Sequence, residues 1–252
     1  MTSSSDQPAS REIPAPERPS WKTGWRSFYY EGAPEAPDPV LLPGKVALLV
    51  IDVQNAYFDR PDPATLAPAE RARQEAWQPF HRRMDEVVVP TIARLIERFR
   101  ADGNHVMFAR IAARLPDGAD RSLSQKKPGW NNILLPRDAH ESQVVPALAP
   151  RADEIVVTKT TDSALTGTNL RLLLTNIGIT HVVAVGVFTD QCVSSTVRSL
   201  ADESFEVIVI EDACAAGTMD LHDQELRIIN RIYCEVMRAD DLIGYLPERP
   251  QK

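Results

Sequence analysis

Cysteine is scarce in this 252-residue sequence, which has three cysteines and no C-x-x-C pair. A small, odd number of thiols argues against a disulfide framework and against a structural zinc knuckle, and it fits a reducing compartment. No stretch approaches the ~20 apolar residues of a membrane span. The first twenty residues are polar and rich in serine and proline, without the apolar core of a signal peptide. These absences predict a soluble, cytoplasmic protein with no membrane partner.

Positive charge is in deficit. Lysine and arginine number 28 against 35 aspartates and glutamates, which gives a formal net charge of -7. Together with the lack of a basic run or an RNA-reading aromatic motif, this balance argues against a nucleic-acid partner or an anionic membrane surface. We therefore expect the partner to be a small molecule. The length and the 43% hydrophobic content are sufficient for one sizeable α/β domain.

Short apolar runs and amphipathic stretches alternate along the chain. They predict strands over 46–51, 105–111, 155–158, 180–187 and 205–210, and helices over about 67–100, 169–176, 192–200 and 220–237. This alternation predicts an α/β fold, a three-layer doubly wound parallel β-sheet flanked by helices, with sites at the carboxyl ends of the strands. The irregular segment 112–150 is long for a compact domain, so we expect residues 114–138 to form a wall of the site.

The N-terminal part differs in composition from the rest of the chain. Residues 1–20 are predicted to be a disordered tail, and residues 45–252 to form the main domain. Between them, residues 21–44 form an arm that is too rich in aromatic side chains for a free linker. Either the arm packs across its own domain or it clasps a neighbouring subunit. The sequence leaves these alternatives open, and we expect a homo-oligomer.

Three reactive side chains stand at the ends of predicted strands. Asp52 follows the first strand, Lys159 follows the third, and Cys192 lies beyond the fourth, in the first turn of the next helix. With Thr189 and Asp190 as N-caps, backbone N–H groups and the helix dipole would stabilise a thiolate there. Each residue alone has a plainer interpretation, as a turn cap, a solvated charge or a core thiol. Together they form a nucleophilic set of base, cation and thiol.

Three segments in register resemble the isochorismatase-like cysteine hydrolase family. Leu48–Asn55 is similar to its opening D-x-Q strand, Thr158-Lys159 to its lysine segment, and Gly186–Val193 to its G-[VI]-x-T-x-x-C-V signature. The family includes nicotinamidases, N-carbamoylsarcosine amidases, ureidoacrylate amidohydrolases and biuret hydrolases. The resemblance implies that residues 45–252 are one such hydrolase domain, and that the oligomer is a dimer or tetramer.

The resemblance also implies roles for single residues. Asp52, Lys159 and Cys192 would be the catalytic triad, in which Asp52 takes the thiol proton and Cys192 attacks an amide or ureido carbon. The backbone N–H groups of Phe188 and Cys192 would form the oxyanion hole. A cis peptide bond would join Val187 to Phe188. Attack on a carbonyl carbon by this triad cleaves a C–N bond.

Metal ligands of the kind found in nicotinamidases are missing from the expected place. Those enzymes carry an Asp-x-His pair and a further histidine after the first strand, and the segment 59–110 has no such pair. The five histidines are scattered without an i, i+4 pair, so each is more often a surface or core residue than a ligand. We expect neither a metal nor another cofactor.

Substrate contacts are expected from the loop and from the two motif segments. Candidate contacts are Asn55, Phe58, Gln125, Trp130 and Gln191, with the amides bonding a urea-like group and Trp130 closing the pocket. The basic residues of the loop either hold a carboxylate or face solvent, and we favour solvent; they are Arg114, Arg121, Lys126 and Lys127. The leading hypothesis is a small ureido or carbamoyl substrate of the biuret, triuret, ureidoacrylate or N-carbamoyl amino acid type. The alternatives are a plain carboxamide, nicotinamide-like or maleamate-like, and a non-catalytic metabolite-binding oligomer.

Overall fold

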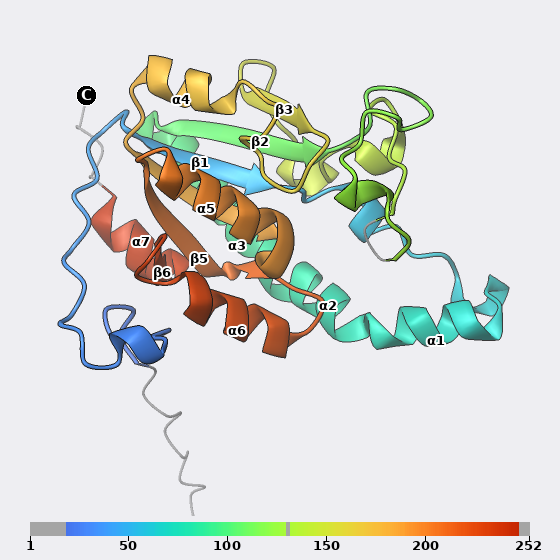
Figure 1. The fold of residues 1–252 in the computed structure, drawn as a ribbon, viewed down its shortest axis with the longest axis horizontal. Coiled ribbons are helices and arrows are strands. Elements are labelled where there is room, and N and C mark those ends of the chain that lie inside the picture. The colour runs from blue at the N-terminus through green and yellow to red at the C-terminus, as the bar shows by residue number, and fades with distance from the viewer. Residues whose placement is uncertain (1–18, 130–131, 247–252) are drawn as a thin grey trace, which may run out of the picture.

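Six parallel strands form the central sheet of the computed structural model, which describes residues 19–129 and 132–246. The strands are β1 (Val46–Ile51), β2 (His105–Ile111), β3 (Ile155–Lys159), β4 (His181–Val187), β5 (Glu206–Ala215) and β6 (Glu235–Met237). Their order across the sheet is β3-β2-β1-β4-β5-β6 (Figure 1). The doubly wound parallel sheet is thereby confirmed. The predicted tail, except its last two residues, and Trp130 lie outside the described residues.

Helices cover both faces of the sheet (Figure 1). They are α1 (Pro68–Ala76), α2 (Gln78–Arg83), α3 (Val89–Asp102), α4 (Leu170–Ile177), α5 (Ser194–Asp202), α6 (Met219–Ile229) and α7 (Ala239–Tyr245). In β1, Leu48 and Val50 pack in one core with α2, α3 and α7, while Leu49 and Ile51 pack in the other with α4, α5 and α6. Burial on both faces explains the continuous apolar run of this strand. None of the described helices is both long and apolar enough to cross a membrane.

Two helical predictions were wrong in extent. The stretch 67–100 is divided into α1, α2, a π-helical turn at Met84–Val88 and α3, and α1 buries no residue. The helix expected over 220–237 ends at Ile229, and a sixth strand follows. Asn230 causes this ending: its backbone is extended, and its side chain donates to the Gly24 and Trp25 carbonyls at 3.2 and 3.0 Å. Those partners are about 200 residues away, so tertiary contacts override a local apolar pattern.

The aromatic arm packs on its own domain, which is the first of the two alternatives. The Trp21 ring meets the Tyr245 ring edge-on at 5.9 Å, and the Trp25 ring meets the His222 ring at 6.4 Å. Phe28 and Tyr29 are left 81% and 85% exposed. Val40 and Leu42 of the arm are 72% and 55% exposed as well, and the homo-oligomer stays a prediction.

A close approach of β1 and β4 marks the centre of the sheet. Gly186 in β4 has a φ of 120°, and a Cβ there would overlap the Ile51 carbonyl oxygen. Glycine is needed for this conformation and this spacing. The strand order reverses between β1 and β4, because β2 and β3 lie on one side and β5 and β6 on the other. A crevice at the carboxyl ends of β1 and β4 is the usual ligand site in such a sheet.

Candidate active site

Asp52, Lys159 and Cys192 meet at this crevice. Asp52 follows β1, Lys159 is the last residue of β3, and Cys192 lies in the π-helical turn Thr189–Val193 after β4. The Lys159 Nζ is 2.7 Å from the Asp52 Oδ2 and donates to the Cys192 Sγ at 3.2 Å. The three residues are 1%, 1% and 6% exposed. The carboxyl ends of three strands thus bring a carboxylate, an ammonium and a thiol into contact.

Backbone conformation and one amide side chain position the base. Asp52 has a φ of 52°, in the left-handed region that an aspartate enters more readily than most residues. Two residues later the buried Gln54 side chain accepts from the Ile111 N–H at 2.8 Å and donates to the Ile111 carbonyl at 2.9 Å. The glutamine of the D-x-Q segment therefore ties the end of β1 to the end of β2.

The turn that carries Cys192 is held in place by a hydrogen bond to the buried His222. The peptide bond between Val187 and Phe188 is cis, where the resemblance placed it. Thr189 is not the N-cap that the sequence predicted, because its Oγ1 hydrogen-bonds the His222 Nδ1 at 2.8 Å and no side chain caps the turn. Burial, then the charge of Arg83, lowers the pKa of His222 to about 3, so this ring is neutral.

Arg83 decides which ring nitrogen of His222 carries the proton. Its guanidinium lies 3.2 Å from the His222 Nε2 and can only donate, so Nε2 accepts. The proton is then on Nδ1 and is donated to Thr189. Arg83 is in turn fixed by the Glu211 and Cys214 carbonyls of β5, at 2.8 and 3.0 Å. The nucleophile turn is thus anchored to β5 through a chain of hydrogen bonds.

Burial dominates the electrostatics of the three convergent residues. It raises the pKa of Asp52, and the attraction of Lys159 offsets this only in part. Burial, the largest single influence, would lower the pKa of Lys159, but the charge interactions and hydrogen bonds with Asp52 and Cys192 together outweigh it and the net shift is upward. Burial and the Asp52 charge raise the pKa of Cys192 well above its ordinary value. The expectation of a thiolate stabilised by the helix end is therefore wrong for the resting site, where Cys192 is a thiol beside the Asp52 carboxylate.

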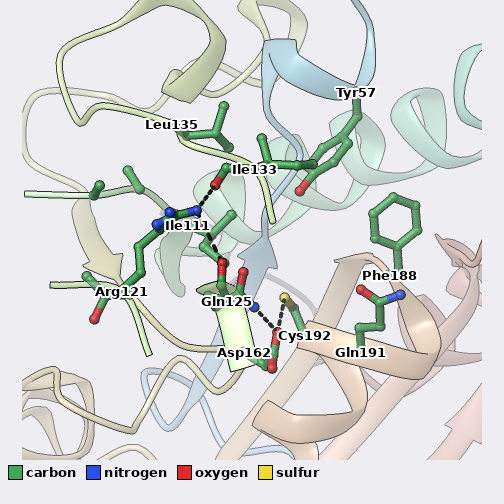
Figure 2. A pocket seen from close by; sticks show the side chains of 13 residues that line it. Tyr57, Ile111, Arg121, Gln125, Ile133, Leu135, Asp162, Phe188, Gln191 and Cys192 are labelled. Carbon is green, nitrogen blue, oxygen red and sulfur yellow. Dashed lines mark hydrogen bonds between the residues drawn. The ribbon is translucent and has the colours of Figure 1, made fainter. Parts of the chain in front are cut away.

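The Cys192 thiol opens into a pocket, while Asp52 and Lys159 lie behind it. Figure 2 shows side chains from the β2 end, the long loop, the segment after β3 and the nucleophile turn around this space. The apolar lining is Tyr57, Ile111, Ala112, Ala113, Ile133, Leu135 and Phe188, and the polar lining is Arg121, Gln125, Thr160, Asp162 and Gln191. An apolar pocket with a few convergent polar groups beside a nucleophile is typical of a small-molecule active site.

The isochorismatase domain family matches residues 46–241 of the sequence. The chain belongs to the isochorismatase family. It is 28% identical over 171 residues to N-carbamoylsarcosine amidase from Arthrobacter sp, a match that covers 66% of this chain and 64% of that protein. It is 26% identical over 194 residues to ureidoacrylate amidohydrolase RutB from Agrobacterium fabrum, covering 71% of this chain and 80% of that protein.

Solved structures of isochorismatase-family proteins have the same fold. One from Burkholderia thailandensis is 30% identical with a TM-score of 0.65, and the match covers 82% of this chain and 98% of that chain. N-carbamoylsarcosine amidase from Thermoplasma acidophilum is 26% identical with a TM-score of 0.59, covering 78% of this chain and 97% of that chain. The isochorismatase-like hydrolase fold expected from the three sequence segments is thereby confirmed.

The expected substrate contacts of this isochorismatase-family hydrolase fall into two groups. Gln125 and Gln191 line the pocket. Asn55 does not, because its side chain donates to the His140 carbonyl at 2.9 Å and so ties β1 to the loop. Phe58 is half-buried against the core that contains α2 and α3. The structure therefore keeps the two glutamines as candidate contacts and gives Asn55 and Phe58 structural positions; Trp130 lies outside the described residues.

Arg121 is not the solvent-facing residue that we favoured. It lines the pocket, and its guanidinium donates to the Gly118, Gln125 and Ile133 carbonyls at 3.3, 3.2 and 3.0 Å. Arg114, Lys126 and Lys127 are exposed, as expected. Arg121 thus holds the loop wall in shape from inside. No cluster of histidine, cysteine and acidic side chains suited to a metal ion occurs in residues 19–129 and 132–246.

Two pocket residues were missed by sequence reasoning. Tyr57 packs edge-on against Phe188 at 5.1 Å, and burial raises its pKa well above the ordinary value, so its hydroxyl stays protonated. Asp162 lines the pocket near the thiol. A signal for Asp162 was present, because it stands three residues after the strand-end Lys159. A signal for Tyr57 was weaker, since an aromatic residue after a strand is more often part of the core.

The raised pKa of the thiol predicts how Cys192 reacts with alkylating agents. Iodoacetamide should label it slowly near neutral pH and faster as the pH rises, because the thiolate is the reactive form and burial disfavours it. The labelled residue is identified by peptide mass spectrometry, since Cys214 and Cys234 are also buried thiols. Rapid labelling of Cys192 that is already maximal near neutral pH would contradict the assignment of a resting thiol.

Proposed function

We propose that this isochorismatase-family hydrolase is a cysteine-dependent amidohydrolase that cleaves a C–N bond in a small ureido or carbamoyl compound. The compound is of the biuret, triuret, ureidoacrylate or N-carbamoyl amino acid type. The observation that carries the proposal is the contact chain from Asp52 through Lys159 to Cys192, at 2.7 and 3.2 Å, with the sulfur facing the pocket. In this contact chain Asp52 can act as a base, Lys159 as a cation and Cys192 as a nucleophile.

The proposed reaction has two steps. Asp52 accepts the Cys192 proton as the sulfur attacks the carbonyl carbon, and Lys159 offsets the negative charge on both groups. The new C–S bond forms, the C–N bond breaks, and the nitrogen leaves as ammonia or an amine with the proton from Asp52. Water then adds to the thioester-like acyl group, the C–S bond breaks, and the proton returns to the sulfur. Loss of ammonia from a ureido substrate gives a carbamic acid, which decomposes to an amine and carbon dioxide.

Backbone N–H groups are proposed to stabilise the oxyanion. Phe188 follows the cis bond and directly precedes the nucleophile turn, and Cys192 lies within that turn. Donors of this kind typically contribute roughly 10²–10³ to a rate. Phe188 also packs against Phe80 and Trp77, with ring centroids at 5.1 and 5.9 Å, so its backbone position is set by the core.

Two relatives support a ureido or carbamoyl substrate over other carbonyl compounds. They are the N-carbamoylsarcosine amidase and ureidoacrylate amidohydrolase matched above, whose names describe cleavage of a carbamoyl or ureido group. Identities of 28% and 26% are compatible with a change of substrate inside one reaction class. A plain carboxamide would use the same nucleophile, so the substrate must be decided by measurement.

Ammonia release from a compound panel tests this proposal. The full chain is incubated with biuret, triuret, ureidoacrylate and N-carbamoyl amino acids, and in parallel with nicotinamide and maleamate. We expect at least one ureido compound to have a kcat/KM about tenfold or more above every carboxamide, a difference of ~1.4 kcal/mol. The Cys192→Ala protein serves as the blank. Turnover confined to carboxamides would contradict the ureido assignment but leave the nucleophile in place.

A further inference from the structure

A second carboxylate, Asp162, faces the nucleophile inside the pocket. It lies in the segment after β3, and its Oδ1 is 3.8 Å from the Cys192 Sγ (Figure 2). The proposed reaction already has its base in Asp52, on the buried side of the sulfur. Asp162 is on the pocket side, where the substrate must lie. The thiol donates a long hydrogen bond to this carboxylate, and because Asp52 already fills the role of base, Asp162 is available to bind the substrate.

Hydrogen bonds fix the direction of the Asp162 carboxylate. The Gln125 Nε2 donates to its Oδ1 at 2.7 Å, and Gln125 is only 5% exposed. The Arg121 guanidinium donates to the Gln125 carbonyl at 3.2 Å and so holds this part of the loop in place. Asp162 is thus a built part of the pocket wall, supported by two further residues.

The charge of Asp162 has no counterion among the described residues. Lys159 is paired with Asp52, Arg121 is bound to backbone carbonyls of the loop, and no ion pair of the described chain includes Asp162. After burial and Asp52, the charge of Asp162 also contributes to the raised pKa of Cys192, which opposes thiolate formation. Asp162 thus opposes formation of the nucleophile and has no counterion in the part of the chain that the structure describes. Both facts are explained if the substrate supplies the group that binds this carboxylate.

A carboxylate accepts hydrogen bonds and cannot donate them, so this partner must carry N–H groups. A ureido group has nitrogen on both sides of the carbonyl carbon. When ammonia leaves one side, the nitrogen on the other side stays on the acyl carbon and keeps its N–H. A carboxamide has carbon in that place, so in the complex the carboxylate loses water, keeps only its partners within the protein and gains none from the substrate. Hydrogen bonds to a charged group of this kind discriminate by roughly 10–100-fold.

We propose that Asp162 selects ureido substrates over carboxamides by accepting the N–H of the nitrogen that remains on the acyl carbon. Gln125 is the positioning residue that aims this carboxylate. The inference rests on the proposed function and specifies it: the substrate has the form R–NH–CO–NH2, with a hydrogen on the inner nitrogen. A substrate whose inner nitrogen is fully substituted does not satisfy Asp162.

Pairs of compounds that differ only at the inner nitrogen test the role of Asp162 in the unaltered protein. In one set, biuret is compared with malonamide, which has CH2 in place of the inner NH. In the other, N-carbamoylglycine is compared with succinamate, which makes the same replacement, and with N-carbamoylsarcosine, which carries a methyl group on the inner nitrogen. We expect kcat/KM to fall by roughly 10–100-fold on each replacement. If the enzyme hydrolyses all members of a set with equal kcat/KM, the inference about Asp162 is overturned. The proposed function is then unaffected.

Substitution of Asp162 supplies the second arm. Asp162→Asn keeps the shape and removes the charge, so we expect it to lower kcat/KM for the ureido member of a set relative to that for the carboxamide member. Gln125→Met should lower the ratio of kcat/KM for the ureido member to kcat/KM for the carboxamide member by a smaller factor than Asp162→Asn does. Asp138→Asn, which removes an equal charge from a side chain of the same loop that is 86% exposed, is the matched control and should keep the ratio.

The outcomes separate the two proposals. A preference in kcat/KM for the ureido over the carboxamide member that is lost in Asp162→Asn and retained in Asp138→Asn supports the role of Asp162. An equal loss on ureido and carboxamide substrates would overturn it, because that is the effect of a damaged fold or of a residue that acts on the thiol. Absence of turnover of every ureido compound by the unaltered protein would contradict the proposed function itself, and the inference with it.

Discussion

Cys192→Ala is expected to lower ammonia release by roughly 10⁴–10⁶-fold, because the carbon–sulfur intermediate can no longer form. The residue is 6% exposed and lines the pocket, with the Lys159 ammonium 3.2 Å from the sulfur. Alanine removes one heavy atom, so the fold should persist and KM should change little. Steady-state ammonia release on the best ureido substrate of the panel measures the effect.

Cys234→Ala is the matched control for that substitution. Cys234 is also buried, at 7% exposure, but it lies between α6 and β6 and not at the pocket. Its loss should reduce stability slightly and leave kcat within about twofold, since a cysteine of this kind acts as a small apolar residue. Turnover in Cys192→Ala at the level of Cys234→Ala would show that another group attacks the substrate.

Lys159→Met is expected to cost about 3–5 kcal/mol of unfolding free energy as well as nearly all activity. Both members of the Asp52–Lys159 pair are 1% exposed, so removal of the ammonium leaves a buried carboxylate without its counterion. Methionine is of similar length and fills the space. Urea denaturation followed by circular dichroism measures the loss of unfolding free energy. A loss well below this range would contradict a desolvated Asp52–Lys159 pair.

The double variant Asp52→Asn/Lys159→Met separates charge from packing. It carries no unpaired charge, so most of the lost stability should return while activity stays absent. A double variant as unstable as Lys159→Met would indicate that packing, not charge, causes the loss.

The stability deficit of Lys159→Met should depend on pH with a definite sign. Burial already raises the pKa of Asp52 in the folded chain, and Lys159 opposes that rise. Without Lys159 the folded-state pKa is higher still, so between the unfolded value and that raised value the native state binds more protons than the unfolded chain. Stability then falls as the pH rises through this window, and the deficit shrinks as the pH is lowered.

The positions of the three convergent residues could be predicted because a parallel sheet brings its carboxyl ends to one edge. A buried strand followed by Asp52, another ending at Lys159 and a third leading to Cys192 are all visible as apolar runs with a reactive residue at the end. Periodicity alone indicates which edge they share. It does not indicate their ionisation, because the raised pKa of Cys192 comes from burial and from the neighbouring Asp52.

Long-range contacts account for what periodicity missed. The sequence around Val236 and Met237 is apolar, and a short apolar run reads equally as helix or as buried strand. It becomes β6 because Asn230 ends the preceding helix through bonds to the arm, which also packs on its own domain through Trp21. Likewise the inward-facing role of Arg121 depends on how the loop folds over the pocket.

Peptide mapping of acid-quenched enzyme during steady turnover of a ureido substrate tests whether Cys192 carries the acyl group. We expect the acyl group of the substrate on the peptide that contains Cys192, and we expect it to disappear once the substrate is consumed. An acyl group on a different residue, or continued turnover with Cys192 unmodified throughout, would contradict it.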